Sequence, residues 1–106
     1  MCITSIQFRQ IEGSAKGVIG WFDANRVSVC NDHPHHLERE WCINIDVVNE
    51  DMGPSARVAL ELTLDSARAL AEAIMAVVEE TEEEEAHLSD AGKTEGLRRQ
   101  NLFHPG

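Results

Sequence analysis

The fold is decided by Ala56-Arg57-Val58-Ala59-Leu60-Glu61-Leu62-Thr63-Leu64 and the segment that follows, Asp65-Ser66-Ala67-Arg68-Ala69-Leu70-Ala71-Glu72-Ala73-Ile74. Apolar residues alternate with polar ones over 56–64, which is typical of a half-buried strand. The period then becomes helical, with one apolar stripe made of Ala67, Leu70, Ala71, Ile74, Val77 and Val78. Thr63 is the predicted helix cap, and Asp65 suits the first turn, near the positive end of the helix dipole. We therefore expect a strand that leads directly into a helix packed on one face of a sheet.

Upstream of this stretch, the pattern predicts further strands at 2–11, 18–22, 26–30 and 41–48. Turn-forming residues separate them at 13–17, 23–25 and 49–55, and residues 31–40 form a polar loop. Short turns favour neighbouring antiparallel strands. The predicted fold class is α+β: a four- to five-stranded antiparallel β-meander with one C-terminal helix packed on one face.

The predicted domain organisation is a single α+β domain over residues 1–85 and a flexible tail over residues 86–106. Glycines and polar residues dominate the tail. The helix is expected to fray in the glutamate run at 79–85, because like charges repel and acidic residues near a helix C-terminus oppose its dipole.

The chain is acidic: its 106 residues include 19 acidic and 9 basic ones, for a net charge of −10. This charge disfavours direct binding to nucleic acid or to anionic membranes. The sequence has no apolar run long enough to span a membrane and no secretory signal pattern. Cys2, Cys30 and Cys42 form no recognisable disulfide framework, which favours a reducing, cytoplasmic location.

Six of the negative charges lie in one short segment, at Glu79, Glu80, Glu82, Glu83, Glu84 and Glu85. One interpretation is a solvated helix end that keeps the protein soluble. The other is an acidic docking patch for a partner protein with a basic surface, because a row of carboxylates can imitate nucleic-acid phosphates and steer association.

Ile19 and Trp21 are predicted to lie on the sheet face opposite the helix, since one helix cannot cover both faces. The apolar tail residues Leu97, Leu102 and Phe103 could cover them. The alternatives are a homodimer or another protein partner, because an exposed Trp beside aliphatic residues is typical of an interface anchor.

Four residues form a candidate zinc site: Cys30, His33, His36 and Cys42. Two thiolates and two imidazoles satisfy tetrahedral zinc, and both cysteines are predicted to share the non-core face of a hairpin. The alternative is two structural thiols beside a solvated loop, residues 31–40, which carries the histidines and is called the histidine loop below. A cysteine nucleophile would need an orienting group and an oxyanion hole, neither of which the sequence offers, so we predict no enzyme activity and no catalytic residues.

The segment Leu62-Thr63-Leu64-Asp65-Ser66-Ala67-Arg68-Ala69-Leu70-Ala71 resembles the ending of short uncharacterised proteins of actinobacteria and their phages, in which a strand runs into a Leu-Thr-x-x-x-Ala-Arg-x-Leu-Ala helix. The chain is also similar in type to small acidic inhibitors encoded by phages. The function predicted from these features is non-enzymatic protein–protein binding without a cofactor, in its most concrete form inhibition of a nucleic-acid-handling complex, of the anti-restriction or anti-CRISPR kind. The alternative is a small zinc-binding regulatory or structural protein.

Overall fold

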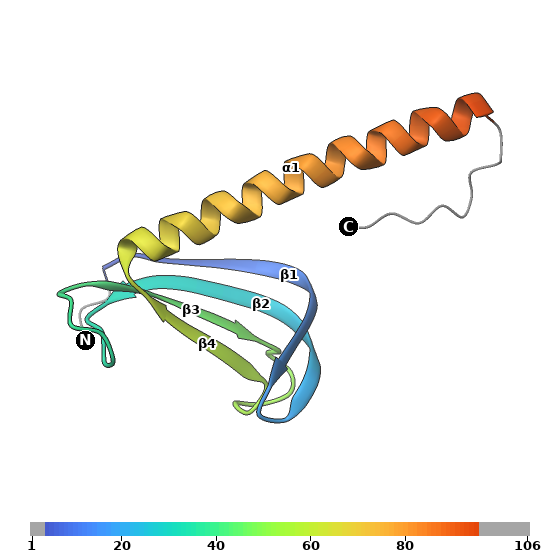
Figure 1. Ribbon diagram of the computed structural model, residues 1–106. Coiled ribbons are helices and arrows are strands. Elements are labelled where there is room, and N and C mark those ends of the chain that lie inside the picture. Colours follow the sequence, from blue (N-terminus) through green and yellow to red (C-terminus); the bar gives the residue numbers. More distant parts are fainter. Residues whose placement is uncertain (1–3, 96–106) are drawn as a thin grey trace. The chain divides into compact units, whose positions relative to one another are not determined.

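The predicted meander and C-terminal helix are confirmed by the computed structural model, which describes residues 4–95, with side chains described for 4–88. The elements in chain order are β1 (Ile6–Gly17), β2 (Gly20–Asp32), β3 (Cys42–Val48), β4 (Arg57–Leu62) and α1 (Leu64–Glu95) (Figure 1). The strands form one antiparallel sheet in the order β1-β2-β3-β4. The chain divides into two compact units, residues 1–68 and 69–106.

The first hairpin differs from its prediction. Residues 13–17 are not a turn but the end of β1. Residues 20–22 of the second predicted strand and the whole of the strand predicted at 26–30 belong to the single strand β2. The turn lies at Val18 and Ile19, closed by the pair Gly17–Gly20. Gly20 has a φ of +94°, a conformation that side chains disfavour and that lets a two-residue turn join twisted strands.

The predicted turn at 23–25 is also wrong, because its polar groups bond to a neighbouring loop instead. Asn25 lies opposite a bulge in β1, where the pairing shifts between Gln10 and Gly13. The Asn25 side chain accepts a hydrogen bond from the Glu50 N–H at 2.9 Å, and the Asn49 amide donates to the Asp23 carbonyl at 2.8 Å. Residues that favour turns locally therefore join β2 to the segment after β3.

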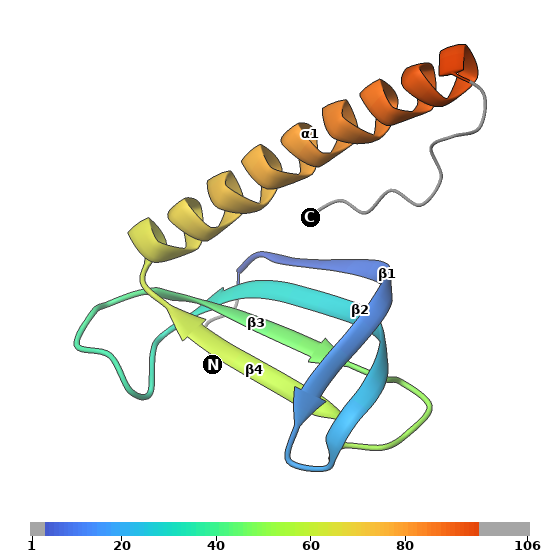
Figure 2. The same cartoon turned by 45° about the vertical axis from the view of Figure 1, so that its right-hand side comes forward.

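The sheet curls, so that the end of the β1–β2 hairpin comes close to the start of β4 (Figure 2). The core lies in this curl and consists of Phe22, Ala24 and Ala56, with Ala15, Val47 and Val58 packed around them. A Cβ on Gly17 would lie 2.8 Å from the Arg57 carbonyl oxygen. The close approach of β1 to β4 therefore requires glycine at this position.

Cross-strand pairing gives the remaining sheet an apolar and a polar face. Direct partners share a face, and side chains alternate along each strand. One face carries Val27, Val29, Ile43, Ile45, Val47, Val58, Leu60 and Leu62. The opposite face carries Ser28, Cys30, Cys42, Asn44, Asp46 and Glu61. This assignment confirms the alternation predicted for β3 and β4.

The helix begins as predicted but continues further. The Ser66 N–H donates to Thr63 Oγ1 at 3.1 Å, which confirms Thr63 as the cap. α1 does not fray in the glutamate run but extends to Glu95, because glutamate is a good helix former and each like-charge pair costs only a few tenths of a kcal/mol. Residues 86–95, predicted as tail, are thus helical, and 96–106 lie outside the described residues.

Candidate binding surfaces

The tip of the β1–β2 hairpin, formed by Val18, Ile19 and Trp21, is apolar and exposed. Val18 is 90% exposed, Trp21 70% and Ile19 47%. Ile19 lies in the turn rather than in the strand predicted at 18–22, whereas Trp21 lies in β2. The tail residues that could cover this surface, Leu97, Leu102 and Phe103, lie outside the described residues.

The hairpin tip is directly joined to packed parts of the sheet. Trp21 pairs across the hairpin with Lys16, while its neighbour Phe22 points to the opposite side and is only 5% exposed in the core. Gly17 closes the hairpin and contacts β4. The Trp side chain has few rotatable bonds, and its strand is held by these contacts. The hairpin tip would therefore lose little conformational entropy on binding a partner.

The predicted acidic patch lies on α1. All six glutamates, Glu79, Glu80 and Glu82 to Glu85, are exposed. The same helix carries large apolar side chains that are also exposed, among them Ile74 at 52% and Val77 at 61%. The helix therefore presents apolar and acidic groups together, and Arg68 is the only Lys or Arg among its described side chains, residues 64–88.

The candidate zinc ligands are not gathered in one place. Cys30 and Cys42 share a face of the sheet, as predicted. The His33 ring instead stacks on Trp41, with centroids 4.7 Å apart, and its Nδ1 lies 2.7 Å from the Glu40 carbonyl oxygen. Within residues 4–88, no three His, Cys, Asp or Glu side chains converge as a metal site would require. The zinc alternative stays a prediction, to be tested by metal analysis of protein purified without added zinc.

Both described cysteines have raised thiol pKa values. Burial is the main cause for each, since Cys42 is fully buried and Cys30 partly so. The neighbouring carboxylates Asp32, Asp46 and Glu61 add to the effect by disfavouring a thiolate. A raised thiol pKa makes both cysteines weaker nucleophiles, because the thiolate is the reactive form.

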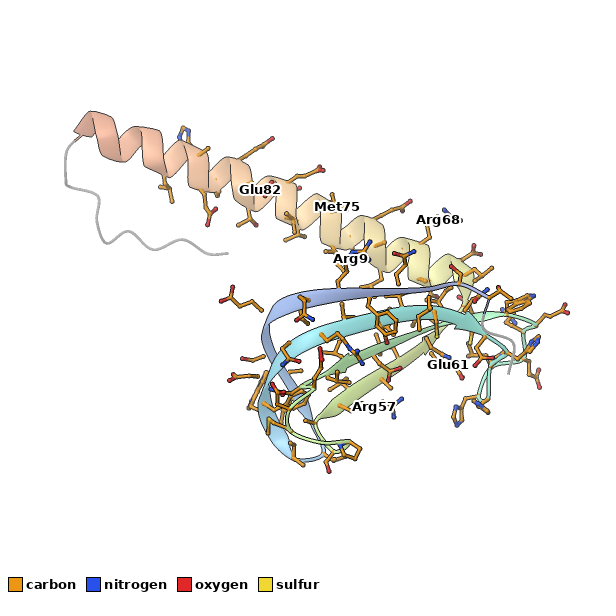
Figure 3. All side chains as sticks on the ribbon, turned by 180° about the vertical axis from the view of Figure 1, so that it is seen from behind. Arg9, Arg57, Glu61, Arg68, Met75 and Glu82 are labelled. Atoms are coloured by element: carbon orange, nitrogen blue, oxygen red, sulfur yellow. The ribbon has the colours of Figure 1, made fainter. Side chains whose placement is uncertain are left out.

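Glu61 holds the histidine loop against the sheet, a role the sequence did not reveal. Its carboxylate accepts hydrogen bonds from the backbone N–H groups of His35 and His36, both at 2.8 Å, and lies 3.4 Å from His36 Nδ1. These bonds, led by the one from His35, lower the pKa of the Glu61 carboxyl. The Glu61 side chain extends from β4, as does the side chain of Arg57, four residues earlier in the same strand (Figure 3).

A hollow of about 460 Å³ lies at the opposite end of the sheet from the hairpin tip. Its lining combines apolar residues with a polar rim: Ser5, Gln7, Val29, Cys30, Asn31, Trp41, Ile43 and Leu64. Asn31 fixes the start of β1, because its Oδ1 accepts the N–H groups of Thr4 and Ser5. The His33 ring stacks on Trp41, which forms part of the lining.

Comparison with known proteins identifies a matching family model. The model of a Family of unknown function (DUF6295) matches residues 1–87. No curated protein and no solved structure matches. Among the described residues, no helix is both long and apolar enough to cross a membrane.

Proposed function

Since the chain belongs to a family of unknown function that lends it no activity, we propose from its surfaces that it is a small, acidic, non-enzymatic protein-binding module. The observation that carries the proposal is the hairpin tip. Val18 in the turn and Trp21 in β2 expose 90% and 70% of their surface, while Phe22, the residue after Trp21, is buried in the core. A large aromatic side chain held in solvent on a rigid base is what interface anchors share.

The partner is a protein with a basic surface. The chain has a net charge of −10, and six of its carboxylates follow one another on α1. Such a field attracts Lys- and Arg-rich surfaces, raises the association rate and makes it sensitive to salt. In its most concrete form, the proposed function is inhibition of a nucleic-acid-handling complex, of the phage-encoded anti-restriction or anti-CRISPR type. The carboxylates of α1 would then occupy a channel of that complex that normally binds phosphates. The free thiols Cys30 and Cys42 agree with action in the reducing cytoplasm.

Affinity capture from the native host, with identification of the bound protein, tests this function. The wild-type chain is compared with Trp21→Ala and with a variant in which Glu82 to Glu85 are all replaced by Gln. Both variants should capture less of the same basic protein, and capture by the wild type should fall as salt increases.

Matched controls separate the surfaces from general effects. Met52→Ala removes an apolar side chain that is 52% exposed elsewhere in the sheet unit. The pair Glu38→Gln and Glu40→Gln removes exposed charge from the histidine loop. Capture that is equal for the wild type, the Trp21 variant and the glutamate variant would show that neither surface binds, and the proposed function would be wrong.

A further inference from the structure

We propose that α1 binds a single amphipathic, Lys/Arg-rich helix of its partner, forming a two-stranded coiled coil along residues 67–88. The inference rests on the proposed function and specifies its partner. It follows from the spacing of the apolar residues on α1, from their exposure and from the position of three glutamates relative to them.

Apolar residues occupy most positions of a seven-residue repeat on α1. The positions separated alternately by three and four residues are Ala67, Leu70, Ile74, Val77, Thr81, Glu84 and Leu88. This is the a/d pattern of a coiled-coil seam, in which each side chain inserts between residues of a facing helix. Thr81 is tolerated in the seam because its hydroxyl donates to the Val77 carbonyl at 2.8 Å. These seven positions span three heptads, and five of them are apolar.

Five of the seven seam side chains are exposed, and Ala67 and Thr81 are half-buried. Leu70 and Leu88 are each 37% exposed, Ile74 is 52% exposed and Val77 61%. Val78 lies directly beside the seam and is 43% exposed. A helix that covers this stripe would remove its exposed apolar surface from water, which favours binding.

The charges on and beside the seam specify what covers it. Glu84 occupies a seam position, while Glu80 and Glu85 occupy the two flanking positions, conventionally g and e, that select a coiled-coil partner. A carboxylate within an apolar seam is favourable only opposite a cation, because an unpaired buried charge is costly. The facing helix therefore carries Lys or Arg opposite Glu84 and at its own flanking positions.

A second copy of this chain is a poor occupant of the seam. In a parallel pair, Glu84 would face its own equivalent, and Glu80 would lie beside Glu85 of the other copy, which places like charges together. In an antiparallel pair, Arg68 is the only Lys or Arg that the described side chains of α1 offer to the glutamates of the other copy. The helix carries too little positive charge to neutralise itself in either direction.

Synthetic peptides of about four heptads test the inference directly. The first peptide has Ile and Leu in its seam, one Lys placed to face Glu84, and Lys at its flanking positions. The second is identical except that Glu replaces every Lys. Each is labelled and titrated with the intact protein, with fluorescence anisotropy for affinity and far-UV circular dichroism for helix formation. We expect the Lys peptide to bind and fold and the Glu peptide to bind about 100-fold more weakly, which corresponds to about 2.8 kcal/mol.

Two adjacent residues give a matched pair of variants. Ile74→Ser changes a seam residue that is 52% exposed, and Met75→Ser changes an off-seam residue that is 55% exposed. Met75 shares its position in the repeat with Arg68 and Glu82, seven residues away on either side along α1 (Figure 3). We expect Ile74→Ser to weaken binding of the Lys peptide about tenfold or more, Met75→Ser to leave it unchanged, and Glu84→Gln to weaken it and to reduce its salt dependence.

Several results would overturn the proposal. These are no binding of the Lys peptide, equal binding of the two peptides, and equal behaviour of Ile74→Ser and Met75→Ser. A dimer of the wild-type chain that sedimentation shows to dissociate in Ile74→Ser would assign the seam to a second copy instead. If Ile74→Ser retains capture of the host protein while Trp21→Ala loses it, the proposed function stands and the coiled coil is wrong.

Discussion

Replacement of Gly17 by Ala should destabilise the sheet, although alanine normally stabilises a strand relative to glycine. The added methyl group would lie 2.8 Å from the Arg57 carbonyl oxygen, about 0.6 Å short of the 3.4 Å at which ordinary contact begins. The obstacle is backbone on β4, so it cannot move aside as a flexible side chain would. Overpacking of this kind costs about 1–3 kcal/mol, and the reduced entropy of the unfolded chain returns about 0.4–1 kcal/mol.

The expected net loss for Gly17→Ala is therefore about 1–2 kcal/mol, or a fall in melting temperature of about 5–10 °C. Gly13→Ala is the matched control, because Gly13 lies in the same strand with negative φ and has nothing within 4 Å of an added Cβ. That variant should gain about 0.4–1 kcal/mol. Thermal and urea unfolding followed by circular dichroism measure both. Equal stability of the two variants would refute the close packing of the hairpin end against β4.

Three further predictions concern the tip, the loop and the thiols. Trp21→Ala should leave the free energy of unfolding within about 0.5 kcal/mol of wild type, whereas Phe22→Ala, one residue along, should cost about 3–5 kcal/mol in the same urea titration. Because the pKa of Glu61 is lowered, the contribution of its carboxylate to loop order is present above the usual carboxyl pKa and is lost as pH falls through the lowered pKa. In wild type, hydrogen exchange of the His35 and His36 amides, which donate to this carboxylate, should speed up in that pH range. In Glu61→Gln, exchange of the same two amides should already be faster at neutral pH. Cys42 should resist labelling by iodoacetamide in the folded protein, whereas Cys30 should react slowly at neutral pH and faster as pH rises. Mass spectrometry measures the labelling of each cysteine. Prompt labelling of Cys42 would contradict its burial.

The parts of the fold that follow from local pattern could be predicted from the sequence. Ile43, Ile45 and Val47 alternate with polar residues, and the period changes at Thr63 from two to about 3.6. Both signals are written in consecutive residues and need no knowledge of distant partners. The helix cap was predictable for the same reason, since a side chain and a backbone group three residues apart form it.

The first hairpin could not be predicted in the same way, because its glycines serve distant contacts. Gly17 is glycine because β4 approaches it, and Asn25 lies in a strand because its side chain bonds to the segment after β3. Each of these reasons lies 25 or more residues away along the chain. The interpretation of 13–17 and 23–25 as turns was locally sound and was overridden by cross-strand pairing.

The histidine loop shows the same limit at the candidate site. Composition grouped His33 and His36 with the cysteines, but Trp41 and Glu61 decide where the two histidines lie. Glu61 gave only a weak signal, as one acidic residue on the outward side of a strand. Knowledge of the strand register would have placed it beside the loop, since Glu61 pairs with Asn44 and Asn44 with Cys30.

The balance between buried and exposed apolar groups connects the fold to the proposed binding. Among the described side chains, the buried apolar residues are Phe22, Ala24, Cys42 and Ala56, which are mostly small. The large apolar side chains of the tip and of α1 are solvated, so burying them against a partner would add free energy that the core does not supply. A partner that binds only the folded chain stabilises it by mass action. Partner binding and resistance to unfolding should therefore rise together, and a variant that lowers affinity at the seam should lose that added stability without losing the stability of the free chain.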